Sequence, residues 1–226
     1  QRHGMDVIRI EQGHSDYPTV LLDRLGNAAP SCLYTAGSLA TLKNPLLGLV
    51  CSIQCPGSLV IKTLDAIRTL RDAGVVVVGG FHSPMERECL DILLRGDQPV
   101  ILCPARALAG LRIGQGPRRA VKEGRLLVLS PFTENTRRTT ATQAVERNNL
   151  VAALVDALWV PHAAPGGKTW ATVSQALQRG QTICTLDDAE NAPIIDSGAM
   201  AMNAEDMVNL VGSAIARGNQ QKGNWG

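Results

Sequence analysis

The sequence predicts an α/β fold, a doubly wound and mostly parallel sheet with helices on both faces and a small N-terminal lead-in. From about Leu46 onward, short apolar runs alternate with longer segments whose apolar residues recur at helical spacing. Runs such as “VVVV” (Val75–Val78) are continuously apolar, as parallel strands are when helices cover both faces. A chain of 226 residues, 45% of them hydrophobic, is also long enough for one large core.

The lead-in is expected over residues 1–44, packed on the edge of the sheet. It contains a short helical pattern that begins near Tyr17, then “CLYTAG”, then another helical turn that ends near Lys43. Residues 45–218 are expected to form the Rossmann-like domain, and residues 219–226 a disordered tail.

The strands of this domain are expected, in order, at Leu47–Cys51, Val75–Gly79, Val100–Cys103, Leu126–Leu129, Leu158–Val160 and Thr182–Thr185. Helices are expected between them at Gly57–Asp72, Pro84–Leu94, Pro117–Lys122, Thr140–Ala157 and Thr169–Gln178. A last helix is expected from Asn203 to Arg217, with Asn203 as its N-cap and Gly218 at its end.

Composition excludes several classes of protein. A net charge of +2 is too small for a polycation that binds nucleic acid by overall charge, so such a site must be local. The six cysteines contain no C-x-x-C pair, so we expect neither a metal site nor a redox motif, but reduced residues of a cytoplasmic protein. No apolar stretch approaches the ~18 residues that span a bilayer, so no membrane association is expected.

Ligands of open parallel sheets bind at the carboxyl ends of the strands, and the loop after Val75–Val78 is one candidate. Gly79 and Gly80 would let a phosphate or sugar approach the backbone. Ser83 and Glu86 fit a capping box, with Ser83 as N-cap and Glu86 at N3, or else contact the ligand. His82 is either a residue of the capping loop or a ligand contact.

A second candidate loop is “HAAPGGKTW”, which begins at His162. It is not a P-loop, because that motif requires glycine at position 162. Two interpretations remain: a phosphate nest made by Gly166 and Gly167 beside Lys168, or a glycine turn with Thr169 as N-cap.

Basic charge is concentrated in the centre of the chain. Nine basic and three acidic residues lie between Pro104 and Arg147, which is the local excess that a polyanion site requires. Phe132 is the one aromatic residue in this segment, so stacking on bases would be sparse. The alternative is a solvated surface of ordinary arginines.

Taken in order, several segments resemble the DprA/Smf family of DNA-processing proteins, whose extended Rossmann domain belongs to the superfamily of the LOG-type phosphoribohydrolases. The segments are Tyr17-Pro18, “LYTAG”, “GVVVVGGFHSPMERECLDIL”, “LLVLSPF”, “ERNNLVAALVDALWV”, “GGKTWATVSQALQRGQTICTL” and “IIDSGAMAM”. The resemblance is to the core domain only, over roughly Tyr17 to Met200.

The resemblance implies a protein of DNA uptake or recombination that binds single-stranded DNA in a basic groove, as a homodimer, and passes it to a recombinase. It implies no cofactor. The phosphates would be held by Arg106, Arg137, Arg138, Arg147 and Lys168. Arg147-Asn148 stands where the family has Arg-Asn, so Arg147→Ala is expected to weaken ligand binding with little loss of stability.

The departures keep other functions open. The Gly-Ser-Arg of the family's first loop reads Cys51-Ser52-Ile53 here, without the arginine. The main alternative is a LOG-like protein that binds or hydrolyses a small nucleotide, but Val173 replaces the catalytic glutamate of those enzymes. Binding without chemistry is therefore favoured, no catalytic residue is assigned, and chemistry through Glu86 remains as the enzymatic possibility. A third possibility is a purely structural role.

Overall fold

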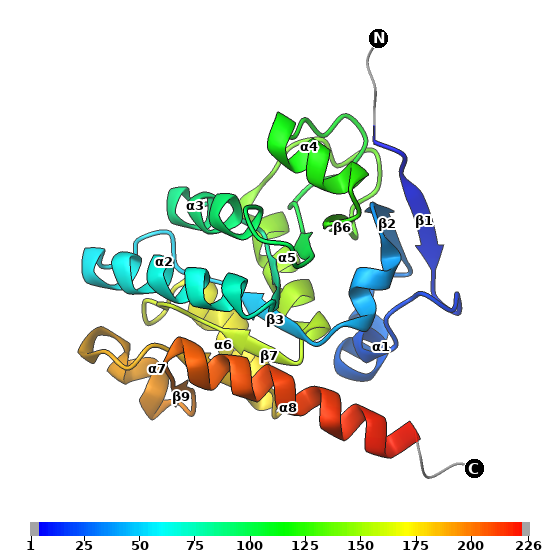
Figure 1. Cartoon of the computed structure of the whole chain (residues 1–226). Coiled ribbons are helices and arrows are strands. Elements are labelled where there is room, and N and C mark those ends of the chain that lie inside the picture. Colours follow the sequence, from blue (N-terminus) through cyan, green and yellow to red (C-terminus); the bar gives the residue numbers. More distant parts are fainter. Residues whose placement is uncertain (1–4, 223–226) are drawn as a thin grey trace.

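The computed structural model describes residues 5–222, with side chains through Ser213. Its described residues form one nine-stranded sheet of order β1-β2-β6-β5-β4-β3-β7-β8-β9 (Figure 1). The pairs β1·β2 and β2·β6 are antiparallel and all other pairs are parallel. The predicted α/β fold with a mostly parallel Rossmann-like sheet is confirmed.

All six predicted strands are present, with ends that differ by at most two residues: β3 (Leu46–Leu49), β4 (Val76–Gly79), β5 (Val100–Leu102), β6 (Leu126–Ser130), β7 (Ala157–Trp159) and β8 (Thr182–Thr185). The helices between them are α2 (Gly57–Asp72), α3 (Pro84–Leu93), α4 (Gln115–Lys122), α5 (Ala141–Leu154) and α6 (Lys168–Gln178). Helix α5 ends three residues before the predicted Ala157, which instead begins β7.

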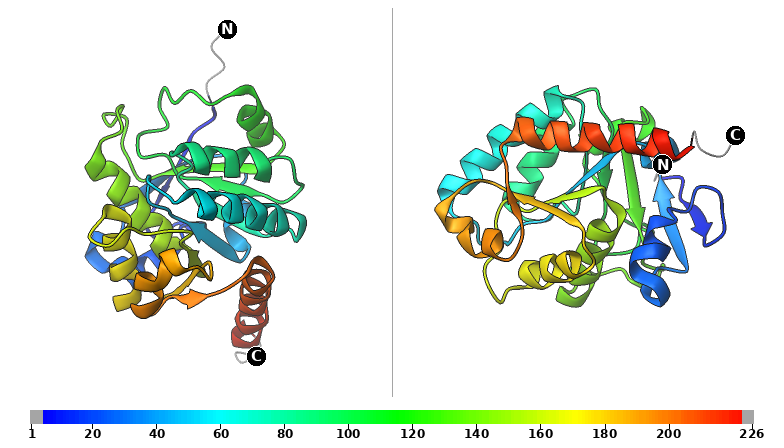
Figure 2. Two further views of the ribbon diagram at one scale, coloured as in Figure 1. Left: turned by 90° about the vertical axis from the view of Figure 1, so that its left-hand side faces the viewer. Right: turned by 90° about the horizontal axis from the view of Figure 1, so that it is seen from below.

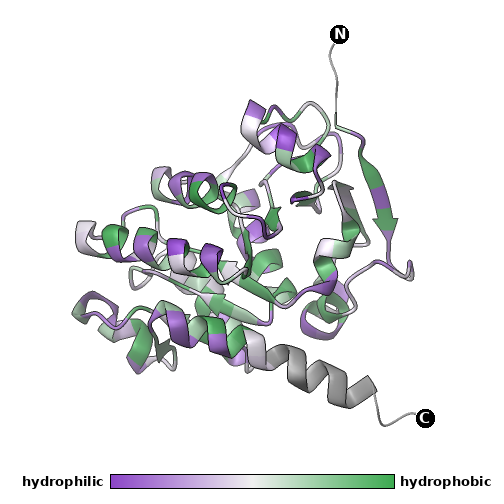
Figure 3. Ribbon diagram, in the orientation of Figure 1, coloured by the Kyte–Doolittle hydropathy of each residue, from purple (hydrophilic) through white to green (hydrophobic). Residues whose placement is uncertain are grey.

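Helices cover both faces of the sheet, as the two further views show (Figure 2). Side chains of β4 alternate between the two cores: Val77 packs with α2, α3, α4 and α8 (Ala204–Lys222), whereas Val76 and Val78 pack with α1 (Val20–Leu25), α5 and α6. This double burial explains the continuously apolar strands. The central strands are accordingly hydrophobic, while the helices carry alternating hydrophobic and hydrophilic bands (Figure 3).

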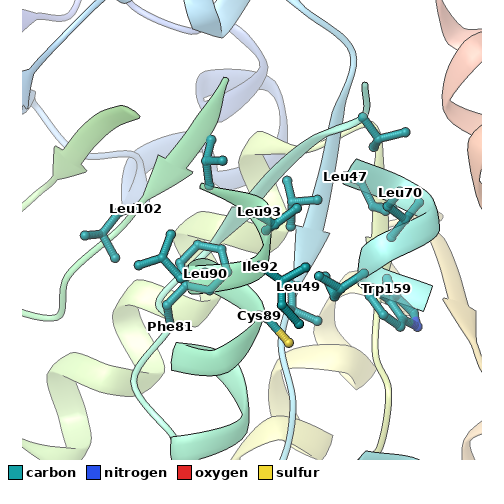
Figure 4. Close-up of a cluster of buried hydrophobic side chains, with 14 of the residues drawn as sticks. Leu47, Leu49, Leu70, Phe81, Cys89, Leu90, Ile92, Leu93, Leu102 and Trp159 are labelled. Carbon is teal, nitrogen blue, oxygen red and sulfur yellow. The ribbon is translucent and has the colours of Figure 1, made fainter. Parts of the chain in front are cut away.

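The loop after β4 is anchored in the first of these cores. The ring of Phe81 packs among Leu90, Leu102 and other apolar side chains, and Trp159 lies at the opposite side of the same cluster (Figure 4). Phe81 has φ 47°, and it is the one non-glycine residue with positive φ between residues 5 and 222. Such a backbone costs on the order of 1 kcal/mol, which burial of the ring offsets.

The lead-in is more regular than the sequence indicates. “CLYTA” forms β2 (Cys32–Ala36), which pairs with β6, and β1 (Ile8–Glu11) pairs with β2 as the edge strand, so both extend the sheet by antiparallel pairing. Gly37 ends β2 with φ 114°, and a Cβ there would collide with the carbonyl oxygen of Leu126. Tyr17 donates a hydrogen bond from its hydroxyl to the carbonyl of Pro30 (2.6 Å), so the family-like residues of this region have structural roles.

The remaining elements follow β8. They are the 3₁₀ turn η3 (Ala189–Asn191), the short helix α7 (Ala192–Asp196), the two-residue strand β9 (Met200–Ala201) and α8, whereas the 3₁₀ turns η1 (Gly26–Ala28) and η2 (Leu39–Lys43) lie in the lead-in. Asn203 caps α8, since its Oδ1 accepts from the Asp206 N–H (2.8 Å). The helix continues to Lys222, beyond the end predicted at Gly218. Residues 223–226 of the predicted tail, and the first four residues, lie outside the described part.

The order of strands reverses between β3 and β7. Successive connections from β3 move toward β6, and the chain then returns through α5 to place β7 on the other side of β3. Such a switch point opens a crevice at the carboxyl ends of the strands. No helix within residues 5–222 has both the length and the apolarity needed to cross a membrane.

Candidate functional site

A cavity of about 280 Å³ lies at this reversal of strand order, and we call it the switch-point cavity. Residues of the loops after β3, β4 and β6, and of helices α3, α5 and α6, line it: Cys51, Ile53, His82, Ser83, Glu86, Thr139, Thr140, Ala141, Ala144, Val145, Arg147, Asn148, Lys168 and Thr169. The loops after β3 and β7 are held together, because Ser52 N–H donates to His162 O and Ala164 N–H donates to Ser52 Oγ, both at 3.0 Å.

Three helices begin at the wall of this cavity. Ser83 is the N-cap of α3, Thr140 is the N-cap of α5, and Lys168 is the first residue of α6. Each helix N-terminus carries a partial positive charge and N–H groups without a partner inside the helix, of which the capping boxes already satisfy those of Glu86 and Gln143. Their convergence makes the cavity favourable for an anion.

The start of α3 confirms the predicted capping box. Ser83 N–H donates to Glu86 Oε2 (3.0 Å), and Glu86 N–H donates to Ser83 Oγ (3.2 Å). Both residues are buried, yet both line the cavity. The structural and ligand-facing interpretations of this pair are therefore compatible, because one carboxylate oxygen holds the cap while the side chain borders the cavity. His82 is exposed at the rim.

Arg147 is the buried cation of the site. Its side chain is inside the protein, and the residue is only 5% exposed. Nη1 donates to Cys103 O (3.1 Å) and Nε donates to Asn148 Oδ1 (2.8 Å). Burial lowers the pKa of Arg147, and the charge of nearby Glu86 opposes that shift. The expectation that Arg147 contacts a ligand stays a prediction, because Arg147 lines the cavity while its guanidinium is hydrogen-bonded inside the protein.

Gly80 explains how this arginine is accommodated. A Cβ at Gly80 would coincide with the Arg147 guanidinium, with Nη1, Cζ and Nε as its nearest atoms. The glycine after β4 therefore makes room for an internal side chain. Gly79, expected beside it as part of a ligand cradle, is the last residue of β4 and does not border the cavity.

The second predicted loop supplies the exposed cation. Gly167 is the N-cap of α6 and contributes no side-chain hydrogen bond, so the interpretation of Thr169 as N-cap is wrong. Thr169 is buried in the first turn, and Lys168 is exposed and lines the cavity. Gly166 and Gly167 form the turn that leads into the helix and do not border the cavity, and Gly167 N–H donates to Ala164 O (3.0 Å).

The residues of the central basic segment do not gather at the cavity. Arg106, Arg137 and Arg138 lie on the loops after β5 and β6 but do not line the cavity. Arg106 Nε is buried and has no hydrogen-bond partner among the described residues. Other basic residues lie on and after α4, where Glu123 pairs with Arg119 (2.6 Å) and Arg125 (2.7 Å). Only Arg147 of this segment reaches the cavity.

Several lining residues escaped the sequence analysis. Thr140 opens α5 in a capping box with Gln143, and the pattern T-x-x-Q is a signal that identifies such a start. Ile53 is 80% exposed at the cavity, at the position where the resembling family carries arginine. An exposed isoleucine in a loop has no pattern that predicts it.

Cys51 and Cys55 flank Ile53 as a pair of thiols. Both are free, and Cys51 lines the cavity. A hydrogen bond between the two thiols raises the pKa of Cys51, with burial adding to the shift, and lowers the pKa of Cys55. In the described part of the chain, no group of three or more His, Cys, Asp or Glu side chains is placed to hold a metal ion.

The sequence matches the profile of the DNA recombination-mediator protein A family over residues 9–212. No curated protein sequence matches the chain. Among solved structures, DNA processing protein A (DprA) from Streptococcus pneumoniae is similar with a TM-score of 0.76 and 18% identity, over 90% of this chain and 74% of that one.

Two further solved structures share the fold. DNA processing protein A from Helicobacter pylori, described for its single-stranded DNA binding mode, has a TM-score of 0.74 and 18% identity, over 93% of this chain and 97% of that one. The molybdenum cofactor binding protein from Rippkaea orientalis has a TM-score of 0.54 and 13% identity, over 76% of this chain and 98% of that one. These likenesses concern the fold.

Proposed function

This chain belongs to the DNA recombination-mediator protein A family, and from that premise we propose that it binds single-stranded DNA at the carboxyl edge of its sheet. In this proposal a backbone phosphate occupies the switch-point cavity. The observation that carries it is the convergence of three helix N-termini, from α3, α5 and α6, on one cavity that also contains Arg147 and Lys168.

The two cations have different roles. Arg147 is fixed by its hydrogen bonds to Cys103 and Asn148, so its position requires little ordering when an anion enters. Lys168 is exposed and gains a partner only when the phosphate binds. Glu86, the one carboxylate among the lining residues, is held by the capping box and limits the positive potential.

Titration of a fluorescently labelled single-stranded oligonucleotide across a salt series tests this proposal. We expect the logarithm of the association constant to fall linearly with the logarithm of salt concentration, with a slope of about −0.7 for each phosphate contact. Lys168→Gln should remove about one contact from that slope, whereas Arg95→Gln, an exposed arginine in the loop that precedes β5, should leave it unchanged. Absence of binding at low salt, or binding without a salt slope, contradicts the proposal.

A small nucleotide is the second candidate ligand. The switch-point cavity, at about 280 Å³, is near the lower end of small-ligand sites and suits a mononucleotide better than a long strand. Hydrolysis by the route of the resembling enzymes has no carboxylate to use, because Val173 stands in the place of their catalytic glutamate and is buried in the core. A thermal-shift panel of nucleoside phosphates tests this alternative, and a flat panel together with DNA binding excludes it.

The proposal includes a homodimer and a recombinase as partners, supported by family membership alone. Light scattering during size-exclusion chromatography tests the dimer. Co-sedimentation of a bacterial strand-exchange recombinase with the protein and single-stranded DNA tests the second partner. A monomer at all concentrations, or no co-sedimentation, contradicts the respective part.

A further inference from the structure

A second and larger cavity, of about 640 Å³, lies along the outer side of α5, between α1 and α6. We call it the α5 groove. Its lining residues on α5 run from Ala141 to Leu150, a distance of roughly 14 Å at 1.5 Å per residue. Val145, Leu150 and Pro131 make much of its lining apolar.

The α5 groove adjoins the switch-point cavity. Ala141, Val145 and Lys168 line both. A chain that occupies the switch-point cavity at the start of α6 therefore lies next to the residues at which the α5 groove begins.

Two arginines lie at the far end of the groove. Arg24, from α1, donates from Nη1 to the carbonyls of Ala153 (3.1 Å) and Val155, and so caps the end of α5. Arg179, just after α6, donates from Nε to Gln181 Oε1 (2.9 Å). Neither forms an ion pair with a carboxylate in the part of the chain that the structure describes.

The hydrogen bonds of Arg24 to the carbonyls at the end of α5 explain its position, but they do not explain the position of Arg179. Arg179 Nη2 is buried and has no hydrogen-bond partner among the described residues. Burial lowers the pKa of Arg179, and the like charge of Arg24 lowers it further. The charges of Asp156 and Asp23 favour the protonated form of Arg24, whereas Arg179 has only the like charge of Arg24 beside it, and an anion that accepts the free N–H of Arg179 would supply the partner that it lacks.

The lining also restricts what kind of anion fits. Inorganic phosphate would fill only the end at Arg24 and Arg179. A ligand that alternates apolar and anionic parts would fit the whole groove, with its apolar part on Val145 and Leu150 and its charges near Arg179 and Lys168. A nucleic-acid strand has this alternation, and without aromatic residues in the lining its bases would pack on aliphatic side chains rather than stack.

We infer that the α5 groove is a second binding segment for the same DNA strand, in which Arg179 receives a phosphate several nucleotides away from the one in the switch-point cavity. This inference rests on the proposed function and extends it. It makes a prediction that the first site alone does not make, namely that affinity depends on strand length in two stages.

Fluorescence anisotropy with single-stranded oligothymidylates, from a dinucleotide to about 16 nucleotides, tests the inference over the usual range of site sizes. Two variants remove the second segment: Arg179→Gln, which deletes the charge, and Gln175→Glu, which adds an opposing charge at an exposed position that lines the groove. Arg95→Gln again serves as the control. Circular dichroism melting verifies that each variant is folded.

For the unaltered protein we expect a gain of affinity once the strand is long enough to reach the groove. Both variants should lose about tenfold in affinity for long strands and bind the shortest strands unchanged, as expected for the loss of one charge-assisted contact. If the gain with length persists in both variants, the inference is wrong and the proposed function stands. If no oligothymidylate binds the unaltered protein, both are wrong.

Discussion

The guanidinium of Arg147 occupies the space that a Cβ atom would need at Gly80. One residue is the first after β4 and the other lies in the middle of α5, so their contact joins two elements that are distant in sequence. Because Arg147 is also hydrogen-bonded to Cys103 O, the loop after β5 is fixed by the same side chain. The wall of the switch-point cavity therefore depends on a glycine that is itself not among the lining residues.

Gly80→Ala should displace Arg147 and destabilise the protein by about 1–3 kcal/mol, the usual cost of overpacking. DNA binding should weaken with it. Urea denaturation measures the free energy of unfolding, with Gly116→Ala as a control, because a Cβ at Gly116 meets nothing within 4 Å. In an Arg147→Ala background the Gly80→Ala substitution should be nearly silent. An equal cost in both backgrounds would show that the two residues are not coupled.

Arg147→Ala should lower stability as well as affinity, whereas the sequence led us to expect little loss of stability. The substitution leaves Cys103 O without its charged donor and removes a buried side chain, for an expected loss of about 2–4 kcal/mol. Arg147→Lys should recover part of the stability but less of the affinity, because an ammonium lacks the planar fork. Unchanged denaturation midpoints for Arg147→Ala would contradict this assignment.

Glu86→Gln should leave stability within about 0.5 kcal/mol, since glutamine also serves at N3 of a capping box. Affinity for DNA at low salt should rise, because a negative charge is removed from an anion site. Ser83→Ala is the contrasting variant, and it should cost about 0.5–2 kcal/mol of stability. A loss of affinity in Glu86→Gln would instead indicate that the carboxylate receives a hydrogen bond from the ligand.

Ile53→Arg should strengthen DNA binding and add about one contact to the salt slope. Ile53 lines the cavity and is 80% exposed, so a longer polar side chain there should cost little stability. Anisotropy titrations across salt concentrations measure the gain, and Ile53→Gln controls for the loss of the apolar side chain. An unchanged slope would mean that the ligand does not pass position 53.

Cys55 should be the cysteine that iodoacetamide modifies first. The hydrogen bond with Cys51 lowers the pKa of Cys55, so more of it is thiolate near neutral pH, whereas burial raises the pKa of Cys89, Cys103 and Cys184 to about 12. The pH midpoint of the Cys55 alkylation rate, followed by peptide mass spectrometry, should lie below the usual cysteine range. Cys51→Ala should raise that midpoint, and no change in it would contradict the hydrogen bond.

The sequence by itself determined the order of elements and the local start of α3. Continuously apolar runs indicate strands that are buried on both faces, and apolar residues at helical spacing indicate the helices between them. Both patterns are properties of short segments, so they can be recognised in the sequence alone. The capping box of Ser83 and Glu86 spans four residues and was predictable for the same reason. The parallel order of the strands also predicted which loops lie at the carboxyl edge of the sheet, where ligands bind.

Tertiary structure decided the rest, because it depends on which distant surfaces meet. β2 is a strand because it pairs with β6, and β1 is a strand because it pairs in turn with β2, and no short pattern reports a pairing partner. Arg147 reads in the sequence as one more surface arginine, and only the packing of α5 against the loop after β4 buries it. The tertiary structure also places the basic residues of α4 away from the switch-point cavity. Arg24 and Arg179 are distant in the sequence, but both line the α5 groove because α1 and α6 pack against α5.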